Sequence, residues 1–115
     1  MNIDLSKVRI FIRPGKTDLR KAINGLAAIV ENKMRGELFS GNVYLFCSKG
    51  RSLVKGLWWD KTGFWLCQKR LEQDKFPWPQ DETQVRELTV EQLQMLLEGI
   101  DFFKAHKELY YKKVS

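Results

Sequence analysis

Residues 54–71 read Val-Lys-Gly-Leu-Trp-Trp-Asp-Lys-Thr-Gly-Phe-Trp-Leu-Cys-Gln-Lys-Arg-Leu and contain three of the four tryptophans in the chain. Two apolar segments flank Asp60-Lys61-Thr62-Gly63, which is typical of a β-hairpin turn. Pairing the segments across this turn places Trp58 opposite Trp65. The same register pairs Trp59 with Phe64, Lys55 with Gln68 and Leu53 with Arg70. Such a hairpin is either part of the core with a solvated edge or a surface that meets phosphates and bases.

The segments before the hairpin predict a strand, a helix and a second strand. Polar and apolar residues alternate from Lys7 to Arg13, which predicts a half-buried strand ended by Pro14-Gly15. Thr17 is predicted to cap a helix of about 17 residues that ends near Gly36, because apolar residues then recur every three or four positions. Residues 43–48 are apolar on both faces, which predicts a central strand.

The segments after it predict a loop, a short strand and a helix. Phe76-Pro77-Trp78-Pro79 fits neither a regular helix nor a central strand. Residues 85–88 are a candidate short strand, and Thr89-Val90-Glu91-Gln92 has the pattern of a capping box. The order β-α-β-β-β-(β)-α predicts an α+β fold with a mainly antiparallel sheet of four to five strands and both helices on one face.

Length and composition predict one ordinary soluble domain. The chain has 115 residues, of which 43% are hydrophobic and 30% charged. We expect a single globular domain over residues 1–101 and a basic, aromatic tail over 102–115. No apolar run approaches the roughly 18 residues of a membrane span, and the N-terminus lacks a signal peptide's apolar core. We therefore expect a cytoplasmic protein with no membrane partner.

The sequence offers little for catalysis. Cys47, Cys67 and the single histidine, His106, cannot form a zinc site by themselves, and we expect both cysteines to be reduced core residues. No phosphate-binding glycine motif is present. Asp18 is explained as a first-turn helix residue and Asp60 as a turn residue. We expect no catalytic residue, no metal and no cofactor.

Basic residues fall into two blocks. Residues 1–35 hold eight Lys or Arg against three Asp or Glu, and residues 49–75 hold seven against three. Residues 80–101 hold one against six. Basic blocks favour an anionic partner. The candidate nucleic-acid-binding residues are Arg13, Lys16, Arg20, Lys21, Lys49, Arg51, Lys55, Lys69 and Arg70.

Several motifs resemble a known family. They are Pro14 to Lys21 with Asn24 to Ala27, Phe39 to Gly41, Val43 to Phe46, Lys55 to Asp60, Gly63-Phe64, Lys69 to Glu72, Phe76 to Pro79 and Leu96 to Asp101. Together they resemble the TnpB-type, Orf2-like accessory proteins that bacterial insertion sequences of family sixty-six encode beside their transposase. The resemblance spans about residues 7–101. It implies a helper in transposition, and it carries over no catalytic residues.

Three hypotheses about function remain open at this point. The first is a non-enzymatic accessory factor that binds DNA, either the element ends or the transposase–DNA complex. The second is a protein adaptor for the transposase that makes no nucleic-acid contact. The third is a nuclease or other enzyme. The residues alone do not distinguish DNA from RNA, single strand from duplex, or monomer from dimer.

Overall fold

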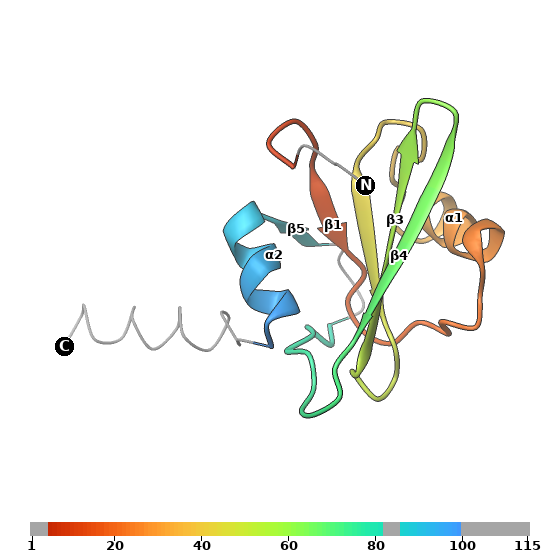
Figure 1. The fold of residues 1–115 in the computed structure, drawn as a ribbon. Helices are drawn as coiled ribbons and strands as arrows, with labels where there is room; N and C mark the ends of the chain where they lie inside the picture. Colours follow the sequence, from red (N-terminus) through yellow and green to blue (C-terminus); the bar gives the residue numbers. More distant parts are fainter. Residues whose placement is uncertain (1–4, 82–85, 100–115) are drawn as a thin grey trace.

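The computed structural model describes residues 5–81 and 86–99 (Figure 1). The predicted domain end at residue 101, the tail over 102–115 and His106 lie outside these residues. The elements in chain order are β1 (Ile10–Ile12), α1 (Ile23–Asn32), β2 (Val43–Cys47), β3 (Leu53–Asp60), β4 (Gly63–Arg70), β5 (Arg86–Leu88) and α2 (Val90–Leu97).

One five-stranded sheet runs in the order β4-β3-β2-β1-β5. The β1–β2 pair is parallel, and the other three pairs are antiparallel. The α+β prediction is therefore confirmed, as is the central place of β2, whose five residues are all buried. The predicted hairpin register is confirmed at each of its four pairs, including Trp58 with Trp65.

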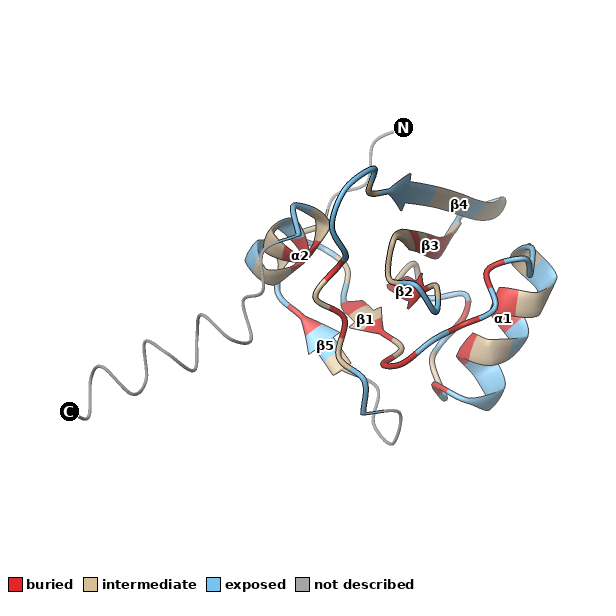
Figure 2. Ribbon diagram, turned by 90° about the horizontal axis from the view of Figure 1, so that it is seen from below, coloured by how far each residue is buried: buried red, intermediate tan, exposed pale blue. Residues whose placement is uncertain are grey.

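The two helices cover opposite faces of the sheet, so the prediction that both lie on one face was wrong. Figure 2 shows α1 and α2 on either side of the strands. Successive strand residues point to opposite faces. On one face, Tyr44 and Phe46 of β2 belong to an apolar cluster with Leu26, Ala27 and Val30 of α1, which we call the α1 cluster. On the other face, Val43, Leu45 and Cys47 belong to a cluster with Leu93 and Leu96 of α2, which we call the α2 cluster. Because β2 is apolar on both faces, each face of the sheet must be packed against a helix to keep these side chains from water.

The first helix begins later than predicted. Thr17 is not its N-cap, because α1 starts at Ile23 and its N-cap residue Ala22 makes no side-chain cap hydrogen bond. Asp18 is consequently not a first-turn helix residue. The Thr17 N–H instead donates to the carbonyl oxygen of Cys47 at 2.8 Å. This long-range bond holds the segment in a non-helical path, which local periodicity could not reveal.

The second helix follows its sequence signal closely. Thr89 accepts from the Gln92 N–H at 3.1 Å, and the Gln92 side chain accepts from the Thr89 N–H at 2.9 Å. This reciprocal capping box confirms the predicted start of α2.

The cysteines differ in burial. Cys47 is fully buried, and burial raises the pKa of its thiol to about 12. Cys67 is half-buried, and burial raises the pKa of its thiol as well. Both are free thiols, and both pack with the α2 cluster. Their thiols therefore stay protonated near neutral pH, as is usual for buried structural cysteines.

We expect Gly36→Ala to destabilise the fold by about 1–3 kcal/mol. A Cβ at this position would lie 2.6 Å from Cε1 and Oη of Tyr44. The Tyr44 ring cannot move freely, because it stacks on Phe11 with a centroid distance of 5.7 Å and its hydroxyl donates to the carbonyl oxygen of Glu37 at 3.2 Å.

Denaturant unfolding measures this cost. The matched control is Gly50→Ala, because a Cβ at Gly50 meets no atom within 4 Å. Equal stability of the two variants would contradict the close approach of Gly36 to the Tyr44 ring.

Candidate nucleic-acid interface

The segment 13–22 connects β1 to α1 and passes over the ends of β1 and β2. The Arg13 N–H donates to the carbonyl oxygen of Leu45 at 3.0 Å and continues the parallel pairing beyond β1. The Gly15 N–H donates to the carbonyl oxygen of Pro79 at 2.7 Å, with Gly15 at a φ of 76°. A left-handed φ of this kind favours glycine. The chain reverses here and is held against the loop after β4.

Two side chains from elsewhere in the fold also hold this segment. The Trp78 indole Nε1–H donates to the carbonyl oxygen of Arg13 at 2.8 Å. The Lys55 ammonium donates to the carbonyl oxygen of Leu19 at 2.7 Å. Segment 13–22 is therefore fixed by bonds to β2, to β3 and to the Phe76–Pro79 loop.

A pocket of about 640 Å³ opens between this segment, α1 and the β2–β3 turn. Part of its lining is aliphatic: Leu19 is buried, and Ile29 and Leu53 are half-buried. The residues that line it are Arg13, Lys16, Thr17, Asp18, Leu19, Arg20, Lys21, Ile29, Ser48, Lys49 and Leu53. We call this site the cationic pocket.

The cationic pocket carries a strong excess of positive charge. Five Lys or Arg and one carboxylate, Asp18, are among its lining residues. Asp18 binds the guanidinium of Arg20 through two hydrogen bonds of 3.0 and 2.9 Å and so neutralises it. Within residues 5–81 and 86–99, no ion pair joins a carboxylate to the remaining four, Arg13, Lys16, Lys21 and Lys49.

The Asp18–Arg20 pair makes a testable pH prediction. The pKa of Asp18 falls from its ordinary 3.8 to about 2, chiefly because Arg20 donates side-chain and backbone hydrogen bonds to the carboxylate. The pair therefore favours the folded state above about pH 4, and this contribution is lost as pH falls through 2. We expect Arg20→Gln to return the Asp18 pKa toward 3.8 in an NMR titration. An unchanged titration would show that the Arg20 side chain is not the cause.

Three further candidate residues do not line the cationic pocket. Arg51 ends the β2–β3 turn, where its N–H donates to the carbonyl oxygen of Ser48 at 3.0 Å. Lys55 reaches the pocket wall at Leu19, as described above. Arg70 lies opposite Leu53 in the β3–β4 register, but an ion pair of 3.1 Å joins it to Glu72.

Lys69 is a predicted residue whose side chain lies on the opposite face of the sheet from Lys55. It lies opposite Val54, a residue of the α2 cluster, so its side chain is on the other face of the sheet. Its ammonium donates to the carbonyl oxygen of Leu97 at 2.7 Å, at the C-terminal end of α2. A cation there complements the negative end of the helix dipole. Lys69 is therefore explained by the fold alone.

The tryptophans divide between core and surface. Trp58 and Trp78 are buried, Trp59 is half-buried, and Trp65 is 44% exposed. Trp65 donates its indole N–H to the Asp60 carboxylate at 3.0 Å. This bond adds to the predicted role of Asp60 as a turn residue.

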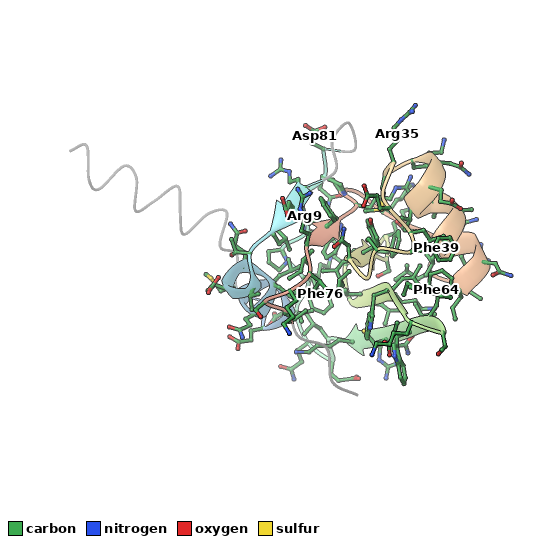
Figure 3. All side chains as sticks on the ribbon, turned by 90° about the horizontal axis from the view of Figure 1, so that it is seen from above. Arg9, Arg35, Phe39, Phe64, Phe76 and Asp81 are labelled. Carbon is green, nitrogen blue, oxygen red and sulfur yellow. The ribbon has the colours of Figure 1, made fainter. Side chains whose placement is uncertain are left out.

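An exposed aromatic group was missed by sequence reasoning. Phe39 is 63% exposed, and its ring lies 5.0 Å from Trp59 and 5.8 Å from Phe64, centroid to centroid. Figure 3 shows Phe39 beside Phe64. Phe39 lies in the loop before β2, far from the hairpin in sequence, so no local pattern connects them. The aliphatic lining of the cationic pocket was missed for the same reason.

The described residues hold no group of three or more His, Cys, Asp or Glu that could bind a metal ion. In the same part of the chain, every helix is too short or too polar to cross a membrane.

Comparison with known proteins identifies the family. The model of the family described as IS66 Orf2 like protein matches residues 8–107, which is most of the chain. The chain belongs to the IS66 Orf2-like family. This membership confirms the resemblance noted from the motifs and supports an accessory protein associated with an insertion sequence.

Two similar relatives come from Sinorhizobium fredii (strain NBRC 101917 / NGR234). One, described as uncharacterized protein y4hO, is 36% identical over 95 residues, which cover 83% of each chain. The other, uncharacterized protein y4jC, is 26% identical over 101 residues, covering 88% of this chain and 86% of the relative. No solved structure was found to match the chain.

Proposed function

We propose that this protein is a non-catalytic accessory factor for transposition of a bacterial insertion sequence. It binds DNA, at the element ends or in the transposase–DNA complex, and the cationic pocket is its contact surface. Because bacterial DNA lies in the cytoplasm, we propose that it acts there. Its second partner is the transposase of the same element.

The observation that carries this proposal is that Lys49 of the second basic block lines the same pocket as four cations of the first block. Residues 13–21 and Lys49 are far apart in sequence, yet they line one pocket. Phosphate groups bind Lys and Arg with release of counterions, and this term provides most of the non-specific affinity for DNA. Four cations without a carboxylate partner in the described residues remain available for phosphate.

Salt titration tests the proposal directly. Fluorescence anisotropy with labelled DNA from the element ends should give an affinity that falls steeply between about 50 and 200 mM salt. An affinity independent of salt would refute phosphate contact. DNA cleavage that needs a metal ion and is abolished by one Asp substitution would instead show that the protein is a nuclease.

We expect Asp18→Asn to strengthen DNA binding. The change frees Arg20 from its bidentate partner and removes the one carboxylate among the pocket-lining residues. The slope of log affinity against log salt should become steeper by up to about 0.9, the value of one added phosphate contact on duplex DNA.

The matched control for this variant is Glu87→Gln. It frees Arg9 from a similar bidentate pair, with hydrogen bonds of 2.7 and 2.8 Å, and neither residue lines the cationic pocket. Glu87→Gln should leave the slope unchanged. If both variants steepened the slope equally, net charge rather than the pocket would govern binding.

A second candidate function is a protein adaptor for the transposase. The exposed rings of Phe39 and Trp65 favour it, because large exposed apolar groups are common in protein interfaces. The acidic residues Glu91 and Glu98 of the α2 region are also exposed. Co-purification with the transposase that survives nuclease treatment and is lost in Phe39→Ser, beside absent DNA binding, would favour the adaptor over the DNA-binding factor.

A further inference from the structure

We infer that the cationic pocket accepts an unpaired nucleotide of DNA. The nucleobase contacts the aliphatic side chains of the pocket, and the phosphate contacts its lysines. This inference rests on the proposed function and specifies the form of DNA that the site recognises.

The shape of the pocket is the first reason. A surface that only follows the phosphates of a duplex needs a band of cations, but no apolar depression beneath them. Here Leu19, Ile29 and Leu53 come from three different parts of the fold and line the pocket together with the Lys and Arg side chains. The volume of about 640 Å³ lies within the range of about 300–1,000 Å³ typical of small-ligand sites.

The chemistry of the ligand is the second reason. In a duplex the faces of the bases are stacked on one another, so a pocket can contact a base face only after the base leaves the stack. Proteins that accept such bases hold them between aromatic or apolar side chains. A nucleotide therefore combines, in one ligand, a flat apolar part for Leu19, Ile29 and Leu53 with an anionic part for Lys16, Lys21 and Lys49.

The Arg13 side chain can donate hydrogen bonds to a base edge or to a phosphate. It is half-buried, and one guanidinium N–H donates to the Thr17 hydroxyl at 3.3 Å. A guanidinium has five N–H donors, so four remain after this bond. Because the backbone of Arg13 is bound to Leu45 and Trp78, the side chain starts from a fixed position.

The first arm of the test compares DNA forms with the full-length protein. A single strand of about 12 nucleotides and a duplex of the same sequence are titrated by anisotropy at several salt concentrations. We expect the single strand to bind roughly tenfold more tightly at equal salt, because only an unpaired base can bury its apolar face against Leu19, Ile29 and Leu53. A strand carrying 2-aminopurine should also change its fluorescence on binding, because the probe base leaves its neighbours.

An RNA strand of the same sequence separates the two sources of unpaired nucleotides, and tighter binding of RNA would overturn the assignment to DNA.

The second arm uses paired variants of two half-buried leucines. Leu53 lines the cationic pocket, whereas Leu66 does not, and both pack against the same apolar cluster. Leu53→Thr should weaken single-strand binding by roughly tenfold, because apolar contact with the base is lost. The salt slope should stay unchanged, because the phosphate contacts remain. Leu66→Thr should leave binding unchanged. Unfolding curves of both variants show whether they are equally folded.

The outcomes separate this inference from the proposed function. Salt-dependent binding in which duplex and single strand are equal, or in which Leu53→Thr has no effect, would overturn the unpaired-nucleotide site and leave DNA binding intact. Absence of binding to every form of DNA would overturn both. A preference for single strands that Leu53→Thr alone removes would establish the site.

Discussion

Replacing Lys16, Lys21 and Lys49 together with glutamine is expected to weaken DNA binding about a hundredfold at about 0.1 M salt. Each lost phosphate contact removes about 0.7–0.9 from the salt slope, so three contacts remove about 2.1–2.7. These lysines come from both basic blocks and line one pocket, and no ion pair occupies them within the described residues. Anisotropy titrations at several salt concentrations measure both quantities.

The matched control replaces Lys33, Lys61 and Lys69 with glutamine. These three exposed lysines make the same change in net charge, and none lines the cationic pocket. We expect this control to keep most of the affinity and nearly all of the slope. If the two triple variants weakened binding equally, the overall charge of +6 would explain the affinity and the pocket would have no special part.

Trp78→Ala is expected to cost about 3–5 kcal/mol of unfolding free energy, the usual range for removing a large buried aromatic. Trp78 is 3% exposed and packs in the α2 cluster with Phe76. Its indole N–H also donates to the Arg13 carbonyl, so the substitution leaves a cavity and removes a partner from the pocket wall. Guanidinium denaturation followed by circular dichroism measures the loss.

Two companion variants identify the source of this cost. Trp65→Ala removes an exposed indole and its cross-strand contact with Trp58, where the ring centroids are 6.4 Å apart, and should cost about 1 kcal/mol. Trp78→Phe keeps most of the packing but deletes the hydrogen bond to Arg13, for about 1–3 kcal/mol. Equal losses in Trp78→Ala and Trp65→Ala would contradict the structural role of Trp78.

Local signals predicted well those elements whose interactions are also local. The hairpin register follows from one turn, because a two-residue connection between Asp60 and Gly63 leaves a single pairing. The start of α2 follows from a capping box whose two hydrogen bonds join residues three apart. The apolar character of residues 43–47 correctly indicated a strand buried on both faces.

The start of α1 was predicted wrongly from local residue types. Thr17 and Asp18 have the residue types of a helix start, but their hydrogen-bonding groups have other partners. The Thr17 N–H is bound to Cys47, and Asp18 is bound to Arg20. The bond to Cys47 spans 30 residues, and a pattern read along the chain cannot include it. The placement of both helices on one face failed for a related reason, since the choice of face depends on packing across the whole sheet.

The amino-acid order alone was enough to establish the α+β class, the hairpin, the excess of positive charge and the family, because each depends on neighbouring residues or on composition. Tertiary structure decided which cations act together. The parallel pairing of β1 with β2 places residues 13–21 beside the β2–β3 turn, where they meet Lys49, whereas strand alternation sends Lys69 to the opposite face. These outcomes depend on backbone hydrogen bonds between distant segments, which no single stretch of sequence contains.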